Sequence, residues 1–172
     1  RLKLLLALAD MRNIYFNTDR VNALLDTMSP DYIKLMPDTF ARFGPDWIAR
    51  QDTSNYINSK TEELRTFMKG RYTNFPNLMR NVFGLGTIKR LTIKVSDATL
   101  GTVRLNNGTL DLTKDFTGMY FPELTITLTA LPADGATFTG WETDSKYVTD
   151  KSSATITIPM TEAVTVKATF SK

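Results

Sequence analysis

Apolar and polar residues alternate strictly in part of the second half of the chain. In Glu123–Ala130, leucine, isoleucine and alanine occupy every second position, and threonines fill most positions between them. This period of two is typical of a strand with one buried and one exposed face. Pro132 and Gly135 then interrupt the run, as turn residues do. We therefore expect Ala136–Glu142 to return beside the first strand as a hairpin.

Further runs with the same period predict a small antiparallel β-module of seven short strands. Asn106–Gly108 is expected to form a tight hairpin turn between two of them. In the last strand, apolar side chains face inward, while threonine and lysine between them face outward. The expected strands are Leu91–Val95, Gly101–Leu105, Thr109–Leu112, Glu123–Ala130, Ala136–Glu142, Ala154–Ile158 and Val164–Phe170.

In the first half, apolar residues recur every three or four positions, which predicts about five helices joined by short loops. Proline is expected to start a helix after Ser29, and Pro37 to kink or break that helix near Leu35 or Met36. Gly70 is expected to end a long helix. The expected helical ranges are 1–16, 19–27, 30–40 with its break, a short turn at Asp46-Trp47-Ile48, 53–69 and 77–83.

The period changes from 3.6 to 2 at Gly84–Thr87, which is the expected domain boundary. We assign residues 1–86 to a helical part and residues 87–172 to a β part. The predicted fold class is α+β with two domains: an N-terminal all-α helical bundle fragment followed by a small antiparallel all-β repeat module. We expect each half to have its own hydrophobic core.

The first ten residues resemble a signal peptide, with Arg1 and Lys3 before an apolar stretch. That stretch, Leu4–Ala9, has six residues, whereas a signal peptide has about 7–15. Helical spacing also continues through Met11 and Ile14, so we interpret the segment as a helix. Its leucines cover most of the circumference, which is typical of a helix buried on several sides. We therefore expect the chain to be a fragment that lacks part of its packing partner.

Composition excludes several kinds of chemistry. The chain has no cysteine and no histidine, so it has no disulfide, no Cys/His metal site and no histidine acid–base catalysis. The net charge is +3, and all of it comes from residues 1–87, which contain 12 basic and 9 acidic residues. This excess is too dilute to indicate nucleic-acid binding, and no apolar run is long enough to span a bilayer. We expect no catalytic residue, no cofactor and no metal.

Four aromatic residues of the second half are the candidate ligand-binding residues: Trp141, Tyr120, Phe121 and Tyr147. Aromatic rings can stack on sugars, but an aromatic side chain in a small β-module more often fills the core. The loop Asp144–Asp150 offers two carboxylates to a calcium ion, yet its spacing is not that of an EF-hand. We expect a solvated loop there.

Five segments of the second half share an order and spacing over about 80 residues. They are Gly101-Thr102-Val103, Leu124–Ala130 with Pro132, Gly135–Trp141 (G-A-T-F-T-G-W), Ala154–Ile158 and Val164–Phe170 (V-T-V-K-A-T-F). In this the chain resembles the divergent internalin-B-type repeat, or Listeria–Bacteroides repeat, of bacterial surface proteins. Ala136 stands where that family usually has an aromatic residue. The resemblance implies a compact β-module of spacer or adhesion type, with no catalytic residues to transfer.

The apolar landmarks of the first half are Ile14-Tyr15-Phe16 before Val21–Asp26, Arg42-Phe43 with Trp47, and Leu64–Arg71 before Leu78–Phe83. They are similar to the C-terminal helices of CotH-like proteins, the spore coat protein H family of atypical kinases. Phe43 stands where tryptophan would be commoner. The nucleotide and metal residues of that family lie upstream of the matching stretch, so none is assigned to this chain.

Together the two resemblances predict a non-catalytic C-terminal fragment of a secreted or surface bacterial CotH-like protein. The helices would complete the kinase-like domain, and the β-repeat would be a spacer or interaction module at the cell surface or outside the cell. Expected partners are the upstream domain, and a cell-wall or polysaccharide surface or another surface protein, without nucleic acid or membrane insertion. The alternative is a carbohydrate-binding module that recognises a cell-wall or plant polysaccharide through exposed aromatics.

Overall fold

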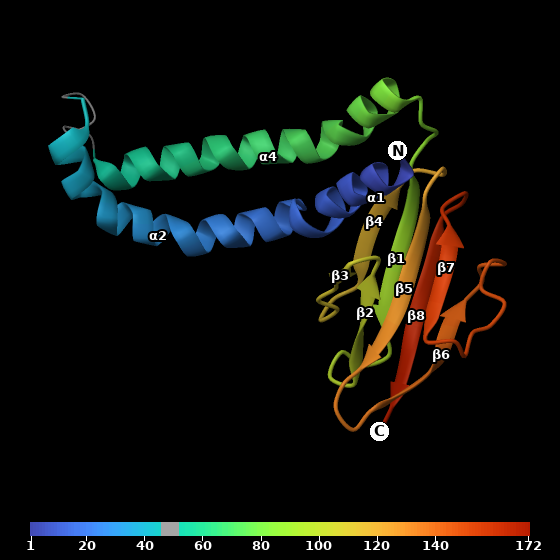
Figure 1. The fold of residues 1–172 in the computed structure, drawn as a ribbon. Helices are drawn as coiled ribbons and strands as arrows, with labels where there is room; N and C mark the ends of the chain where they lie inside the picture. Colours follow the sequence, from blue (N-terminus) through green and yellow to red (C-terminus); the bar gives the residue numbers. More distant parts are fainter. Residues whose placement is uncertain (46–51) are drawn as a thin grey trace. The chain divides into compact units, whose positions relative to one another are not determined.

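The computed structural model describes residues 1–45 and 52–172, which form helices followed by β-strands (Figure 1). The helices are α1 (Leu2–Asp10), α2 (Thr18–Phe43) and α4 (Thr53–Phe83), and a π-helical turn, η1 (Met11–Tyr15), continues α1. The fold class is α+β in two parts, as the periodicity predicted. No helix in these two ranges is both long and apolar enough to cross a membrane.

The described residues form two compact units, and the division between them passes through helices. One unit contains Arg1–Ile14 and Pro76–Lys172, and the other contains Tyr15–Phe75. The unit with the strands thus includes α1 and the end of α4, although the sequence-based division placed residues 1–86 in the helical part. The expectation of a separate helical core is wrong for the described residues, because none in Tyr15–Phe75 is fully buried.

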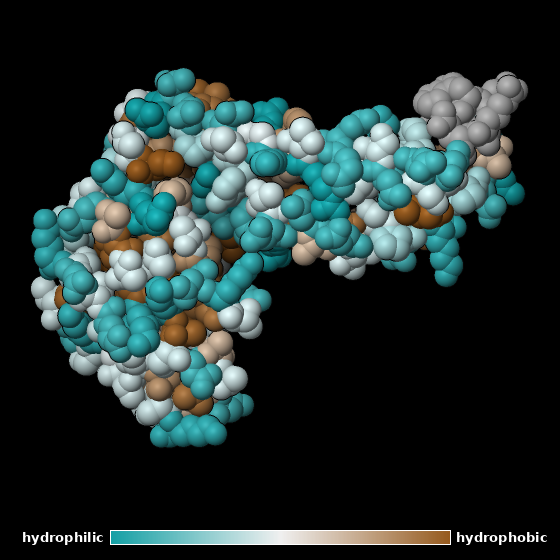
Figure 2. Space-filling view, turned by 180° about the vertical axis from the view of Figure 1, so that it is seen from behind, coloured by the Kyte–Doolittle hydropathy of each residue, from teal (hydrophilic) through white to brown (hydrophobic). Residues whose placement is uncertain are grey.

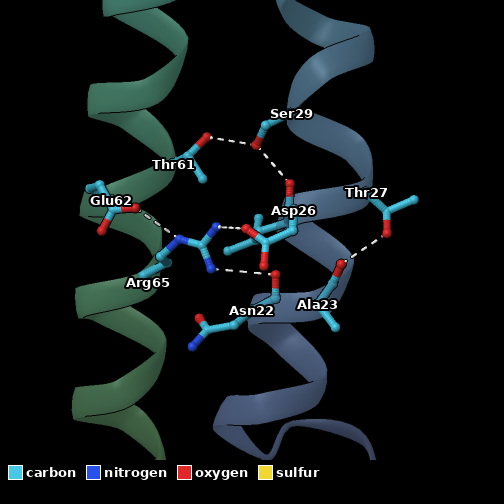
Figure 3. Close-up of polar contacts among 9 residues, drawn as sticks. Asn22, Ala23, Asp26, Thr27, Ser29, Thr61, Glu62 and Arg65 are labelled. Atoms are coloured by element: carbon cyan, nitrogen blue, oxygen red, sulfur yellow. Dashed lines mark hydrogen bonds and ion pairs between the residues drawn. The ribbon is translucent and has the colours of Figure 1, made fainter.

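Within Tyr15–Phe75, α2 and α4 lie side by side and run antiparallel (Figure 3). The Oγ of Ser29 lies 3.1 Å from Oγ1 of Thr61, and the rings of Phe40 and Tyr56 pack edge to face at 5.4 Å. The Asn17 side chain caps α2 by accepting a hydrogen bond from the backbone N–H of Arg20.

Both long helices continue through residues that were expected to start, break or end a helix. Pro30 and Pro37 lie inside α2, and Gly70 and Pro76 lie inside α4. Each proline removes one backbone hydrogen bond, but the rest of the ladder and the contact with the neighbouring helix remain, and such packing overrides the preference of single residues. The predicted breaks are therefore wrong. The short turn expected at 46–48 lies outside the described residues.

Two four-stranded sheets make up the β part (Figure 1). Their strand orders are β4-β1-β8-β6 and β3-β2-β5-β7. Sequence periodicity missed β4 and overestimated the length of β3. The strands are β1 (Lys89–Val95), β2 (Gly101–Leu105), β3 (Gly108–Thr109), β4 (Phe116–Tyr120), β5 (Thr125–Pro132), β6 (Thr137–Thr143), β7 (Thr155–Pro159) and β8 (Val164–Ser171).

The core of the β part lies between the two sheets. In β5, Ile126, Leu128 and Ala130 are buried, and in β8 the apolar residues from Val164 to Phe170 alternate in the same way. The sheets approach closely at Gly101, where an added Cβ would lie 2.7 Å from the Phe170 ring. Burial of alternate residues from both sheets is the usual architecture of a β-sandwich.

One predicted strand pairing is wrong. β5 and β6 do not form a hairpin, because β5 pairs with β2 and β7 while β6 pairs with β8. The turn at Ala133–Ala136 instead carries the chain from one sheet to the other, which lets both strands bury an apolar face in the same core. In addition, β1 pairs in parallel with β8, so the module is mostly but not wholly antiparallel.

Candidate functional site

Trp141 lies inside the β-sandwich and has only 3% of its surface exposed. Its indole Nε1 donates a hydrogen bond to the carbonyl oxygen of Ser153 at 2.8 Å, and its ring lies 5.2 Å from that of Phe138. The bulge in β6 at Phe138–Gly140 shifts the register just before Trp141. No face of this ring is available to a sugar.

The other three candidate aromatics do not join Trp141 in one surface. Tyr120 is fully buried and Phe121 is 3% exposed, whereas Tyr147 is half-buried, with its hydroxyl 3.0 Å from that of Thr161. Tyr120 ends β4 and Trp141 lies on β6, and these strands are the two opposite edges of one sheet. The structure therefore does not bring the four rings together as a flat platform.

A polar cluster at the end of α1 was not predicted from the sequence. Asp10 accepts a hydrogen bond from the Tyr120 hydroxyl at 2.8 Å, and Asn106 Nδ2 donates to both carboxylate oxygens at 2.9 and 3.0 Å. Asn106 occupies the turn between β2 and β3 with φ of +52°. Its side-chain oxygen accepts from the N–H of Thr127, and its own N–H donates to the carbonyl of Thr127. The cluster thus connects α1 to both sheets.

A second asparagine connects η1 to the free edge of β4. The Nδ2 of Asn13 donates to the carbonyl of Met119 at 2.8 Å, and the N–H of Met119 donates to Asn13 Oδ1 at 3.1 Å. Asn13 is 1% exposed, and its Oδ1 also accepts a hydrogen bond from Arg12. The side-chain amide therefore pairs with Met119 as the backbone of a neighbouring strand would.

The buried surroundings change the acidity of two groups in the polar cluster. Burial raises the pKa of Asp10 above its ordinary value, and the hydrogen bonds from Tyr120 and Asn106 counteract this only in part. Burial, followed by the nearby Asp10 carboxylate, also raises the pKa of the Tyr120 hydroxyl. Tyr120 is thus kept as a neutral donor. The geometry of the cluster suits holding a helix in place.

Sequence reasoning missed this cluster for a physical reason. Asp10 and Asn13 lie in an apolar helix, and their partners are about a hundred residues further along the chain. Period and spacing report which face of an element is buried, but they do not report which distant residue lies against it. The one usable signal was the group of polar residues Asp10, Arg12 and Asn13 in an otherwise apolar segment.

The loop that was considered for calcium binding, Asp144–Asp150, is stabilised by local hydrogen bonds of Asp150. Asp150 Oδ1 accepts hydrogen bonds from the N–H and the hydroxyl of Ser152, and these bonds lower the pKa of the carboxyl group. Over residues 1–45 and 52–172, no three acidic residues gather in a way that could hold a metal ion.

These features define a small β-sandwich module that carries a docked helix. Residues 91–172 match the family described as the divergent InlB B-repeat domain. The β part is therefore an InlB-type β-repeat module, as its sequence resemblance predicted. No curated protein and no solved structure matches the chain.

Proposed function

We propose that this chain is a non-catalytic part of a secreted or cell-surface bacterial protein, in which the InlB-type module is a spacer or interaction module. The observation that carries this proposal is the closed sandwich core: the rings most suited to ligand binding, Trp141, Tyr120 and Phe121, are buried in it. Repeats of this family occur in surface proteins. The outward threonines of β5 and β7 give the module a polar exterior that suits a solvated spacer.

For the helical part we propose the role implied by its resemblance to CotH-like proteins, completion of a kinase-like domain upstream. The surface of α2 supports a packing role. Leu24, Met28 and Leu35 recur at helical spacing and are 58, 39 and 68% exposed. On α4, Leu64 and Phe67 are exposed as well. Hydrophobic side chains are visible among the hydrophilic ones in Figure 2. Exposed apolar stripes of this kind mark surfaces that pack against another part.

Two binding measurements test the proposal. A nucleotide at 100 times its dissociation constant would stabilise the chain by about 2.7 kcal/mol, which is a shift of several degrees in melting temperature. We expect Mg-ATP to cause no shift, and a shift would show that the chain handles nucleotide itself. In sedimentation with peptidoglycan or cellulose we expect the chain to stay in the supernatant as a spacer. Retention on either polymer would favour the carbohydrate-binding alternative.

A further inference from the structure

The β-sandwich receives a helix through specific polar side chains as well as through apolar contact. We propose that the surface formed by edge strand β4 and the β2–β3 turn is a helix-docking site, occupied here by residues 2–14, and that Asp10 and Asn13 are its recognition pair. This inference concerns the module itself. It does not depend on the spacer role or on the CotH-like assignment of the helices.

The first half of the site is the free edge of β4. An edge strand presents unpaired backbone groups that can bind another strand. Both backbone groups of Met119 bond to Asn13, so they point away from β1, the partner of β4 on its other side. A side-chain amide carries N–H donors and a carbonyl acceptor next to each other, so one donor and the acceptor can bond to the C=O and the N–H of a single strand residue. Asn13 therefore closes this edge at one position without adding a strand.

The second half of the site bridges the two sheets. Tyr120 belongs to the sheet that contains β4, and Asn106 lies in the turn between two strands of the other sheet. Both donate to Asp10, so one carboxylate is held by both layers of the sandwich. Asn106 is itself fixed by two hydrogen bonds to Thr127. The receiving groups are thus held in position by the fold of the module.

The spacing of the docked segment defines the kind of helix that fits. Leu5 and Ala9 are four residues apart, so they lie on one face of α1, and both are buried. Asp10 and Asn13 follow at the end of that helix, where η1 widens the turn. The site therefore takes a helix with a small apolar face that ends in Asp-x-x-Asn. A general apolar helix would leave Tyr120 and the Met119 backbone unpaired, which is costly for buried groups.

Amide hydrogen exchange in the full chain tests the proposal. Asp10→Ala and Asn13→Ala each remove one recognition residue, and Asp31→Ala and Asn58→Ala are matched changes at exposed helical positions. We expect exchange at Leu5–Asp10 to accelerate about tenfold or more in the first two variants, as the loss of a buried hydrogen bond implies. Amides of β8 should keep their protection. Exchange at Leu5–Asp10 within about twofold of the control variants would overturn the proposal.

Variants on the receiving side separate docking from general instability. Tyr120→Phe removes only the hydroxyl, and Asn106→Gly removes the side chain while tolerating the positive φ. Because Asp10 and Tyr120 share a hydrogen bond, Asp10→Ala combined with Tyr120→Phe should accelerate exchange by less than the product of the two single effects. Acceleration by the product of the two single effects would contradict direct recognition. Asn107→Ala, one residue beyond Asn106 and exposed, is the control for the turn.

Discussion

The indole nitrogen of Trp141 donates a hydrogen bond to the carbonyl oxygen of Ser153, 12 residues further along the chain, at 2.8 Å. The backbone N–H of Trp141 bonds to Lys151 in the same segment. The tryptophan thus fills the core with its ring and holds the segment that follows β6 with its two donors. This double role explains why a residue that could stack on a sugar is turned inward.

Trp141→Ala should therefore destabilise the β part by about 3–5 kcal/mol, as truncation of a buried large aromatic does. Trp141→Phe keeps most of the packing but leaves the Ser153 carbonyl without its donor, so it should cost about 1–3 kcal/mol. Urea denaturation followed by circular dichroism measures both. Phe43→Ala is the control, because that ring is 77% exposed. Equal stabilities of Trp141→Ala and Phe43→Ala would contradict the core position of Trp141.

Two glycines should respond in opposite directions to replacement by alanine. At Gly101 the new Cβ would lie 2.7 Å from the Phe170 ring and 2.9 Å from the carbonyl oxygen of Leu131. Because that oxygen is backbone and cannot rotate away, Gly101→Ala should cost about 1–3 kcal/mol. Gly70 has nothing within 4 Å of the added atom and lies inside α4. Gly70→Ala should stabilise the helix by about 0.5–1 kcal/mol.

Thermal unfolding of the two glycine variants gives the measurement. Gly101→Ala should lower the transition of the β part, and Gly70→Ala should raise the transition of the helices without changing that of the strands. A neutral Gly101→Ala would mean that the two sheets are further apart at this position than the structure shows.

The hydrophobic pattern predicted the strands well, because a strand with one buried face has apolar residues at every second position of its sequence. The alternation in β5 and β8 gave their bounds to within a few residues. It could not predict that β5 and β6 belong to different sheets, because both arrangements bury the same residues. It also missed β4, where Gly118 occupies a buried position without an apolar side chain.

The helical half was less predictable for a different reason. Pro30, Pro37 and Gly70 are strong local signals for helix ends, but α2 and α4 support each other along their length. Local propensity is worth about 1 kcal/mol at glycine and about 3 kcal/mol at proline, and packing can exceed both. The Asp10 cluster was unpredictable because its partners are distant in sequence.

Arg65 joins α4 to α2 in the hairpin (Figure 3). Its guanidinium group donates to Asp26 Oδ1 at 2.5 Å, to the Asn22 carbonyl at 3.3 Å and to Glu62 at 2.9 Å, and its side chain is 20% exposed. Arg65→Ala should cost about 1–3 kcal/mol, because several charge-assisted hydrogen bonds are lost together.

Lys60 provides the comparison for Arg65. Its side chain is 52% exposed, and its ammonium group bonds to Glu63 one turn away and lies over the Tyr56 ring of the same helix, so Lys60→Ala should destabilise the hairpin much less than Arg65→Ala. Helical ellipticity during thermal unfolding measures both variants. If the two losses were equal, the contacts of Arg65 with α2 would contribute nothing to the hairpin.

The exposed apolar stripe of α2 predicts a contrast between neighbouring leucines. Leu24 is 58% exposed, whereas Leu25 is half-buried and lies on the helix face of Asn22 and Ser29, which contact α4. Leu24→Glu should leave the melting temperature of the hairpin nearly unchanged, within about 0.5 kcal/mol, and should reduce binding of a hydrophobic dye. Leu25→Glu should lower the melting temperature, because it places a charge in the interhelical contact. A strong destabilisation by Leu24→Glu would show that its side chain is already packed.

The acidity of Asp10 predicts an unusual pH dependence of stability. Its pKa in the folded chain is raised above the ordinary value of 3.8 that holds in the unfolded chain. At a pH between the ordinary and the raised pKa, the folded chain therefore binds a proton that the unfolded chain releases. The contribution of this group is therefore fully present below about pH 3.8 and is lost as the pH rises through the raised pKa. In Asp10→Asn this dependence disappears. The unfolding free energy of wild type minus that of Asp10→Asn should thus increase as the pH falls from about 7.

A carboxyl group with the opposite shift is the control for this measurement. Hydrogen bonds from Thr99 lower the pKa of Asp97, so its contribution is present at neutral pH and is lost as the pH falls below 3.8. The difference between wild type and Asp97→Asn should therefore decrease on acidification, opposite in sign to that for Asp10→Asn. Urea denaturation of the three proteins between about pH 3 and 7 gives both differences. Curves of the same sign would mean that Asp10 is held mainly as a hydrogen-bonded carboxylate, and that its burial contributes less than the contacts with Tyr120 and Asn106.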